Sequence, residues 1–290
     1  MIQFAKLHGA GNDFSLFDGI NQELPDYSAL AKVVCDRHFG VGGDGIMVAL
    51  PSQVADIKMV YYNSDGSKGE MCGNGSRCFA KFVYEKGLVD KPVFDVETAD
   101  GTKTIKLQLD QQGKVDTITV AIGRPQFDSK KVPTILLGDP VMLEPLEVSG
   151  QLLMVTVMRL GVPHCVIVVD DLDNFDIDDL GSQMEWHPAF PEGMNINFIQ
   201  VMSRSHIKIK TWERGAHHTL ACGTGSCASV VAGNLLGLLD PQVQVTAEGG
   251  ILQISVSPEY DVIMEGKAEF ICEGEYSPWI MAQIEKAQQK

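Results

Sequence analysis

Two short segments of the chain have residue types and a spacing that could move a proton. Cys72-Gly73-Asn74-Gly75-Ser76 and Cys222-Gly223-Thr224-Gly225-Ser226 both place two glycines around a small polar residue, directly after a cysteine. A duplicated motif that carries a thiol suggests two thiols on opposite sides of one carbon. One thiol could remove a proton from one face while the other delivers a proton to the opposite face, which inverts a stereocentre.

Each motif is followed by a stretch of helical length and composition, so each cysteine is expected just before a helix N-terminus. Such a terminus exposes N–H groups and partial positive charge, and glycine lets a ligand approach the backbone closely. We therefore expect both motifs to hold a carboxylate and to lower the pKa of their thiols. The carboxylate oxygens would take up the charge of the carbanion, so no pyridoxal phosphate or other cofactor is needed.

The other candidate features have simpler interpretations. An isolated cysteine is more often a small hydrophobic residue, which is the role expected for the cysteines at 35, 78, 165, 227 and 272. The segment 40–45 matches the spacing G-x-G-x-x-G, but it follows a helical stretch and precedes a strand, so it is interpreted as a tight loop near the site. His217 and His218 would point to opposite sides of a strand, and no metal site is expected.

The composition excludes some partners. The chain has 290 residues, of which 44% are hydrophobic, and a net charge of −15 with no basic tract. This charge argues against binding of nucleic acid or of anionic membrane surfaces, and a small molecule is the expected ligand. The N-terminus lacks the pattern of a signal peptide, which predicts a cytoplasmic protein with reduced cysteines.

The hydrophobic pattern predicts an α+β fold of two similar domains, each a curved, mostly antiparallel sheet around a central helix. The domains are expected at 1–113 and 114–267, with the boundary in the polar stretch Asp110 to Lys114 and a tail helix in 277–290. Strands are expected at Gln3–Leu7, Ile46–Leu50, Ile57–Tyr62, Val93–Val96, Thr104–Leu109, Thr117–Ile122, Leu153–Met158, Cys165–Val169, Ile196–Met202, Ile207–Trp212, Gln242–Thr246 and Leu252–Val256. Helices are expected at Ser28–His38, Cys78–Lys86, Cys227–Leu239 and Trp279–Gln289.

These residues resemble the diaminopimelate epimerase family over nearly the whole chain. The motifs that carry the resemblance are His8-Gly9-Ala10-Gly11-Asn12-Asp13-Phe14, Asp36-Arg37-His38-Phe39-Gly40-Val41-Gly42, Asn63-Ser64-Asp65-Gly66-Ser67, Met71-Cys72-Gly73-Asn74-Gly75-Ser76-Arg77-Cys78, Pro163-His164, Asn195-Ile196-Asn197-Phe198, Glu213-Arg214-Gly215 and Ala221-Cys222-Gly223-Thr224-Gly225.

The resemblance implies interconversion of LL- and meso-diaminopimelate, a step toward lysine and peptidoglycan precursors, in a cleft of a two-domain protein that is usually a homodimer. It implies Cys72 and Cys222 as the acid and base, with His164 and Glu213 beside the reacting centre. The remaining roles are binding roles: Asn74, Gly223 and Thr224 at the reacting carboxylate, and Asn12, Asn63, Asn195 and Arg214 at the distal end of the substrate. Gly73 joins the carboxylate-binding set because it lies in the first glycine motif at a helix N-terminus. The last strand, near 268–276, would return to the first domain.

Two departures from the family pattern bear on the substrate. The chain has Val162 before Pro163-His164 where the family commonly has Asn, and His217-His218 where it commonly has Gly-Glu. A racemase of the same fold that acts on another amino acid, such as histidine, is therefore an alternative, and Asn74 argues against the proline racemase relatives. Alternatives from other classes are a hydrolase that pairs Cys72 or Cys222 with His164, and a binding protein without catalysis.

Overall fold

The computed structural model describes residues 2–69 and 72–288, and the chain divides into two compact units. The first unit contains residues 1–120 together with residues 266–290, and the second contains residues 121–265. The polar stretch Asp110 to Lys114, where the sequence predicts the boundary, forms a hairpin turn in the first unit. Its ends are joined by a hydrogen bond from Asp110 N to Lys114 O of 2.8 Å.

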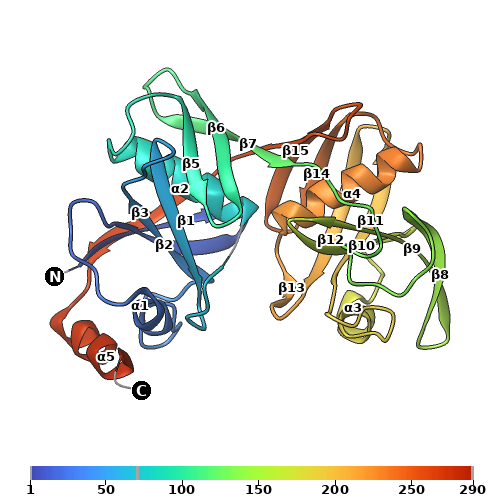
Figure 1. The fold of residues 1–290 in the computed structure, drawn as a ribbon, viewed down its shortest axis with the longest axis horizontal. Helices are drawn as coiled ribbons and strands as arrows, with labels where there is room; N and C mark the ends of the chain where they lie inside the picture. The colour runs from blue at the N-terminus through green and yellow to red at the C-terminus, as the bar shows by residue number, and fades with distance from the viewer. Residues whose placement is uncertain (1, 70–71, 289–290) are drawn as a thin grey trace. The chain divides into compact units, whose positions relative to one another are not determined.

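Both units mix strands and helices, as the ribbon in Figure 1 shows. The elements of the first unit are β1 (Gln3–Gly9), β2 (Asn12–Asp18), α1 (Tyr27–Val34), β3 (Gly45–Leu50), β4 (Ile57–Asn63), α2 (Gly73–Glu85), β5 (Val93–Thr98), β6 (Gly101–Leu109), most of β7 (Val115–Gly123), β17 (Glu269–Glu275) and α5 (Pro278–Gln288). Those of the second unit are β8 (Val141–Val148), β9 (Gln151–Leu160), β10 (Val162–Val168), α3 (Ile177–Glu185), β11 (Asn195–Ser203), β12 (His206–Glu213), β13 (His217–Thr219), α4 (Gly223–Leu235), β14 (Gln242–Ala247), β15 (Gly250–Val256) and β16 (Val262–Gly266).

The two units repeat one strand arrangement. In the first, β17, β1 and β2 pair antiparallel, β2 and β3 pair parallel through α1, and β4 and β5 pair parallel through α2. In the second, β8, β9 and β10 pair antiparallel, β10 and β11 pair parallel through α3, and β12 and β14 pair parallel across the segment that contains α4. The prediction of two similar α+β domains with mostly antiparallel sheets is confirmed.

This strand arrangement places the starts of two strands and the end of a third side by side at one edge of the sheet in each unit. Parallel strands start at the same edge, and an antiparallel neighbour ends there. In the first unit the starts of β2 and β3 therefore lie beside the end of β4, after which the chain leads to α2. In the second unit the starts of β10 and β11 lie beside the end of β12 in the same way.

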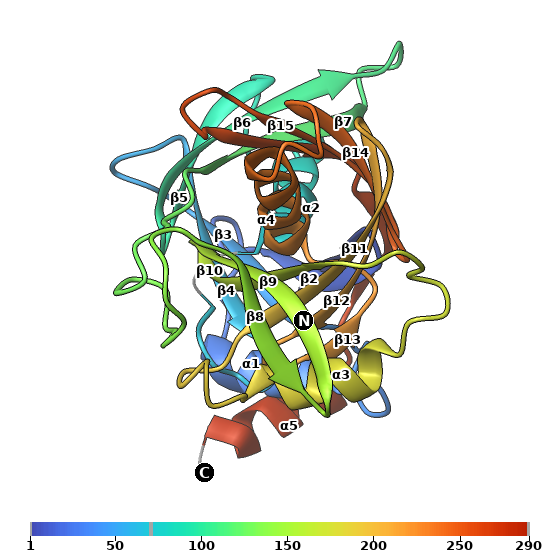
Figure 2. The same ribbon diagram turned by 90° about the vertical axis from the view of Figure 1, so that its right-hand side faces the viewer.

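The central helix of each unit is enclosed by its own sheet, as Figure 2 shows for α4. Every residue of α2 from Gly73 to Val83 is buried, and so is every residue of α4 from Gly223 to Gly233. The small side chains of α4 let the strands pack closely around it. The helix starts differ from the sequence prediction, since α2 and α4 begin at Gly73 and Gly223, so the glycine motifs form the first helical turns.

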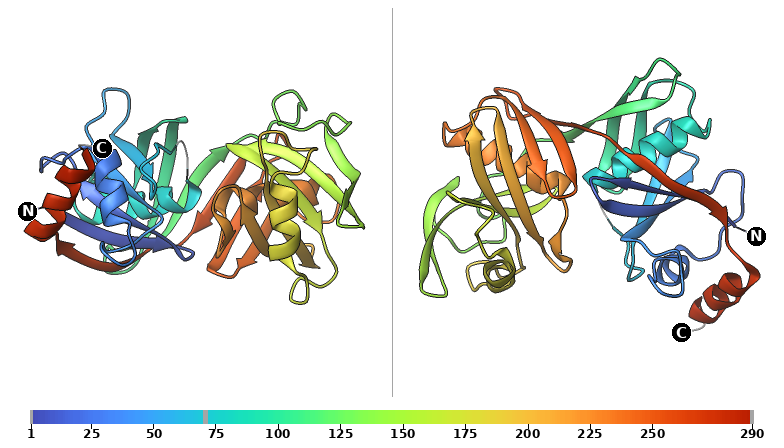
Figure 3. Two further views of the ribbon diagram at one scale, coloured as in Figure 1. Left: turned by 90° about the horizontal axis from the view of Figure 1, so that it is seen from below. Right: turned by 180° about the vertical axis from the view of Figure 1, so that it is seen from behind.

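The C-terminal helix belongs to the first unit, where α5 lies beside α1 in the views of Figures 1 and 3. Its Ile280 and Ile284 join a core cluster with residues of α1 and β3. Gln289, the expected end of this helix, lies outside the described residues, as does Met71 of the first cysteine motif.

Other parts of the sequence prediction need correction. The helix expected to reach His38 ends at Val34, because Asp36 accepts hydrogen bonds from the N–H groups of His38 and Phe39 and forms a separate turn. Strands β2, β8, β13 and β16 and helix α3 were not expected at all. Cys272 is exposed on β17, so it is not a packing residue. None of the helices in the described part of the chain is long and apolar enough to cross a membrane.

Candidate active site

Cys72 is the N-cap residue of α2, at the sheet edge described above. Its Sγ accepts a hydrogen bond from the Gly75 N–H at 3.3 Å, and the Ser76 hydroxyl donates to its carbonyl oxygen at 2.9 Å. The sulfur therefore takes the place of the usual N-cap oxygen and faces the positive end of a helix dipole. Its side chain is only partly buried, so a ligand can reach it.

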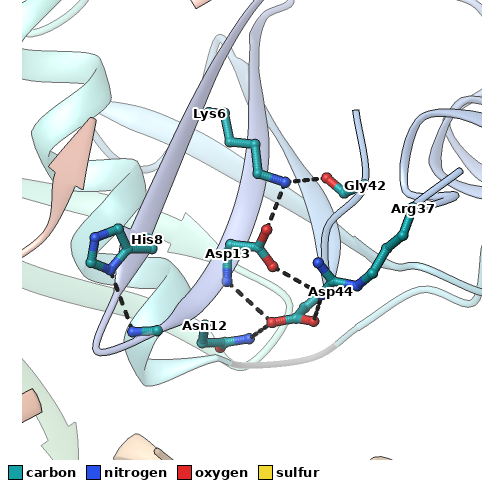
Figure 4. A network of polar contacts seen from close by, with 8 residues as sticks. Lys6, His8, Asn12, Asp13, Arg37, Gly42 and Asp44 are labelled. Atoms are coloured by element: carbon teal, nitrogen blue, oxygen red, sulfur yellow. Dashed lines mark hydrogen bonds and ion pairs between the residues drawn. The ribbon is translucent and has the colours of Figure 1, made fainter. Parts of the chain in front are cut away.

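Asn12, at the start of β2, contacts this sulfur. An ionic network orients the Asn12 side chain (Figure 4). The Cys72 thiol donates to Asn12 Oδ1 at 3.4 Å, and Asn12 Nδ2 donates to Asp44 Oδ2 at 2.5 Å. Arg37 Nη2 forms salt bridges with Asp44 Oδ1 at 2.9 Å and with Asp13 Oδ1 at 3.3 Å. Asp13 in turn forms a salt bridge with Lys6, whose Nζ lies 2.6 Å from Asp13 Oδ2. The loop of residues 40–45 thus holds the Asn12 amide, which agrees with its interpretation as a tight loop near the site.

The ionic network is partly shielded from water. Burial alone would raise the pKa of Asp13, but Lys6 and Arg37 beside it outweigh burial, and the pKa is lowered. Asp13 is therefore ionised at neutral pH and keeps Lys6 in place. Figure 4 also shows Lys6 Nζ directed at the Gly42 carbonyl, so β1 is tied to the loop that carries Asp44.

Two further predicted binding residues lie in the same unit. Asn63 ends β4, where its Nδ2 donates to Ser67 Oγ at 2.9 Å and its Oδ1 accepts from the Tyr61 hydroxyl. Asn74, in the first turn of α2, is 2% exposed, and its Oδ1 accepts from Arg77 at 3.0 Å. Its side-chain oxygen is thus engaged within the helix.

Cys222 repeats the geometry of Cys72 in the second unit. It is the N-cap residue of α4, its Sγ accepts from the Gly225 N–H at 3.4 Å, and the Ser226 hydroxyl donates to its carbonyl oxygen at 2.9 Å. The Thr224 hydroxyl lies 3.6 Å from the sulfur. Both cysteines therefore occupy equivalent positions, which supports the view that the two motifs are copies of one device.

The electrostatics of Cys222 contradict the expectation of a lowered thiol pKa. Burial raises the pKa of the Cys222 thiol well above its usual range, and Glu213 adds to this by its charge and by a hydrogen bond. The Thr224 hydroxyl and the Gly225 N–H oppose the shift but do not outweigh it. Cys222 is 6% exposed, and at neutral pH it carries its proton.

Glu213 ends β12 and is positioned on its other side by Thr219, whose hydroxyl donates to Oε1 at 2.6 Å. A carboxylate between a thiol and a hydroxyl can hold the thiol proton in a fixed direction. The family resemblance implies that Glu213 lies beside the reacting centre, and in the structure Glu213 hydrogen-bonds with Cys222.

His164 lies in β10 and is fully buried. Burial lowers its pKa to about 3, and the positive charge of Arg214 acts in the same direction. The ring is therefore neutral at physiological pH. Its Nδ1 lies 3.2 Å from Asn197 Nδ2, whereas Nε2 is buried without a hydrogen-bond partner among the described residues.

Asn195 and Arg214 contact each other, but Asn195 is occupied by the protein itself. Its Oδ1 accepts from the Arg214 N–H at 3.0 Å and its Nδ2 donates to Pro163 O at 2.8 Å. Arg214 Nη1 donates to Glu192 O at 2.8 Å. In this arrangement Asn195 holds the backbone that carries Arg214.

Three supporting residues were not assigned a role from the sequence. Asp44 orients Asn12, Asn197 contacts His164, and Glu185 is a buried carboxylate that accepts from Trp212 Nε1 at 2.7 Å and from the Gly215 N–H at 2.8 Å. Asn197 lies two positions from the predicted binding residue Asn195, on the same face of its strand, which is a signal that could have suggested it. Asp44 lies in the glycine-rich segment 40–45, where only its acidic side chain marks it. No group of three or more histidine, cysteine, aspartate or glutamate residues in ranges 2–69 and 72–288 could hold a metal ion.

Comparison with known proteins identifies the family. A sequence model described as diaminopimelate epimerase matches residues 4–127 and 156–271, which include both cysteines. A protein named diaminopimelate epimerase from Alkaliphilus metalliredigens is 44% identical over 278 residues, covering 95% of this chain and 97% of the relative. One of the same name from Clostridium perfringens is 44% identical over 276 residues, with 95% and 99% covered. The chain belongs to the diaminopimelate epimerase family.

Solved structures with the same fold are more distant in sequence. A probable proline racemase from Agrobacterium radiobacter K84 has a TM-score of 0.67 at 14% identity, covering 96% of this chain and 93% of that one. A Bacillus anthracis protein of the PhzF family, described as a phenazine biosynthesis protein, has a TM-score of 0.66 at 19% identity, with 95% and 99% covered. These matches establish the fold and leave the substrate to other arguments.

The structure shows the backbone conformation and the contacts at the two departures from the family pattern, His217-His218 and Val162. His217 adopts a φ of 62°, the left-handed region that favours glycine, at a position where the family commonly has glycine. His218 lies 2.6 Å from Glu248 and 3.1 Å from Asp178, so it joins β13 to two neighbouring segments. Val162 is the first residue of β10. Its side chain has no polar atom, so it cannot form the hydrogen bonds that an asparagine could form at this position.

Proposed function

We propose that this protein interconverts LL- and meso-diaminopimelate by passing the α-proton between two cysteines, without a cofactor. The observation that carries the proposal is the equivalent placement of Cys72 and Cys222 as N-caps of the two buried central helices. Family membership and relatives at 44% identity support the substrate. The same relatives support a place in lysine and peptidoglycan precursor synthesis.

In the proposed reaction the Cys72 thiolate removes the α-proton and becomes a thiol. The electron pair of the broken C–H bond moves onto the carboxylate, giving an enediolate-like carbanion. The Cys222 thiol then delivers its proton to the opposite face and becomes a thiolate, which inverts the centre. The raised pKa of the Cys222 thiol supports this assignment, because a thiol held by burial and by Glu213 is protonated when the substrate arrives.

The remaining residues have proposed roles in binding. The first-turn N–H groups at Gly73, Asn74, Gly223 and Thr224 would hold the reacting carboxylate, because helix N-termini bind anions. His164 and Glu213 would lie beside the reacting carbon. Asn12, Asn63 and Arg214 would hold the distal end, with Asn195 contributing through its hold on Arg214.

A Cys–His hydrolase is less well supported. A general base must take a proton near neutral pH, but burial lowers the pKa of His164 to about 3. A racemase for another amino acid, such as histidine, would use the same thiols, so the distinction between it and the proposed enzyme depends on Val162 and the distal binding residues.

The experiment that tests the function is α-proton exchange. Reduced protein would be incubated in D₂O with LL-diaminopimelate, meso-diaminopimelate, histidine, glutamate and proline, and deuterium at each α-carbon followed by NMR. Exchange with inversion for diaminopimelate alone is expected, and it should disappear in Cys72→Ala and in Cys222→Ala. Exchange with only another amino acid would overturn the substrate, and full turnover by either single variant would overturn the two-thiol mechanism.

We also infer a homodimer that works in the cytoplasm. No disulfide joins cysteines in the described part of the chain, which suits a reducing compartment. The dimer rests on the family resemblance alone. Light scattering on the purified protein would test it, and a mass of one chain at working concentration would contradict it.

A further inference from the structure

Asn197 is a fully buried polar residue of β11, and it forms hydrogen bonds with both neighbouring strands, β10 and β12. Its Nδ2 lies 3.2 Å from His164 Nδ1 and 3.2 Å from Cys165 O, while its Oδ1 accepts from the Thr211 hydroxyl at 3.2 Å. We propose that Asn197 is a positioning residue that holds His164 as the tautomer protonated on Nε2, so that His164 donates a hydrogen bond to the substrate. The substrate part of this inference rests on the proposed function.

The orientation of the Asn197 amide follows from its partners. A backbone carbonyl can only accept, so the amide atom facing Cys165 O has to be the nitrogen. The hydroxyl of Thr211 can donate to the oxygen on the other side. A flipped amide would place two acceptors, Asn197 Oδ1 and Cys165 O, against each other inside the core, which is unfavourable.

This orientation decides which ring nitrogen of His164 carries the proton. Asn197 Nδ2 presents an N–H to Nδ1, so Nδ1 is the acceptor and has no hydrogen of its own. A neutral imidazole has one N–H, which therefore lies on Nε2. Because burial lowers the pKa of His164 to about 3, the ring stays neutral and this single tautomer persists through the physiological range.

The Nε2–H group of His164 is the part of the ring that could donate a hydrogen bond to a ligand. Nε2 is buried and has no hydrogen-bond partner within the described residues. Since it is a donor, it would bind an atom with a lone pair, such as an oxygen of the reacting carboxylate, and it cannot accept from an ammonium group. A neutral imidazole donor can stabilise charge that develops on oxygen while a proton leaves carbon.

Asn197 also contacts the helix that carries the catalytic thiol. A Cβ at Gly225 would collide with Asn197 Oδ1, so the amide lies directly against the first turn of α4. The same turn supplies the N–H that Cys222 Sγ accepts. Asn197 therefore fixes the His164 ring and packs against the Cys222 cap at once, which suits a residue that positions both groups.

The first test is the tautomer itself, read from imidazole nitrogen chemical shifts in ¹⁵N-labelled protein. The His164 signals are assigned by their loss in His164→Gln. We expect protonated Nε2 and bare Nδ1 in the protein without ligand. Protonated Nδ1 would overturn the proposal, and this measurement needs no Asn197 variant to fold and no substrate to react.

The second test uses Asn197→Asp, which keeps the shape and replaces the donor by an acceptor. A carboxylate accepts from Nδ1–H, so the tautomer should reverse, and kcat for inversion should fall by about 10- to 100-fold with little change in KM. Asn197→Ala, which leaves Nδ1 without a fixed partner, should show a mixture of the two tautomers. Retention of the Nε2–H tautomer in both variants would overturn the positioning role. Failure of wild-type exchange would instead count against the proposed function, whatever the tautomer.

Discussion

At the scale of single residues, the decisive feature is the environment of the two thiols. The glycine motifs suggested lowered pKa values at both cysteines, because helix N-termini favour anions. For Cys222 this prediction was wrong. The helix terminus is present and contributes the Gly225 N–H, but burial and Glu213 act in the opposite direction and prevail. Burial of one thiol and a carboxylate beside it come from the tertiary fold, so no local motif could have predicted them.

Replacing Glu213 by glutamine should make the Cys222 thiol more acidic. The substitution removes a negative charge and a carboxylate acceptor, both of which raise the pKa of that thiol. The rate of Cys222 alkylation would be measured by mass spectrometry as a function of pH, in a Cys227→Ala background. The midpoint of this pH profile should move to lower pH in Glu213→Gln. Asp261→Asn, far along the chain in a surface ion pair, serves as the control. An unchanged midpoint in Glu213→Gln would show that Glu213 does not tune Cys222.

His164 should make the free energy of unfolding depend on pH. The unfolded chain binds a proton at this histidine near pH 6.5, whereas the folded chain does not until about 3, because the ring is buried. The stability that the neutral His164 contributes is therefore fully present above pH 6.5. It is lost as the pH falls from 6.5 toward about 3, by up to about 1.4 kcal/mol per pH unit. Urea unfolding at several pH values should show a flatter dependence for His164→Gln. An equally steep dependence in His164→Gln would contradict the buried neutral ring, and His38→Gln, on a surface loop, provides the control.

At the scale of elements, the first turns of α2 and α4 look alike but are packed differently. A Cβ at Gly75 would meet the flexible end of Met47, whereas a Cβ at Gly225 would meet Asn197, which is held by its hydrogen bonds. Flexible side chains can shift, but anchored ones resist. The two copies of the motif should therefore respond unequally to the same substitution.

We expect Gly225→Ala to be more damaging than Gly75→Ala. Overpacking of a rigid site costs about 1–3 kcal/mol, and the displaced Asn197 should also lower epimerisation. Gly75→Ala should cost less, since Met47 can change its rotamer. Chemical denaturation and α-proton exchange on both variants would check this, and a larger loss in Gly75→Ala would contradict the assignment of Asn197 as the rigid neighbour.

Many strands were predictable because their buried apolar positions alternate, as in β6, β14 and β15. Strand β2 was missed because it begins with the polar pair Asn12-Asp13, whose side chains serve the Asp44 network instead of marking a strand. The helix starts were misplaced for a related reason. Glycine has low helix propensity, so Gly73 and Gly223 were assigned to loops, although tertiary packing makes them helical.

At the scale of the whole molecule, the two units differ in how the chain forms them. The second unit is one continuous stretch, whereas the first needs residues from both ends of the chain. Strand β17 pairs with β1, and the Tyr276 N–H donates to Ile2 O at 2.9 Å. The ring of Tyr276 also stacks on Phe4 at a centroid distance of 4.4 Å. Only the family resemblance predicted this return, because contacts between chain ends leave no local pattern.

The difference should appear in fragments of the chain. Residues 121–265 should unfold cooperatively on their own, since their core cluster lies within the fragment. Residues 1–120 alone should not, because β1 would be an unpaired edge and the partners of Ile280 and Ile284 in α1 would be exposed. Each buried isoleucine contributes about 1.5–3 kcal/mol.

The measurement is thermal unfolding followed by circular dichroism, with hydrogen exchange to report on β1. Adding residues 266–290 as a separate polypeptide should restore protection in residues 1–120, whereas the same peptide with Ile280→Ala and Ile284→Ala should restore less. The control peptide carries Glu285→Ala at an exposed position of α5 and should act like the native sequence. Cooperative unfolding of residues 1–120 alone would show that the first unit is complete without its C-terminal part, and β17 would then be an addition to a finished sheet.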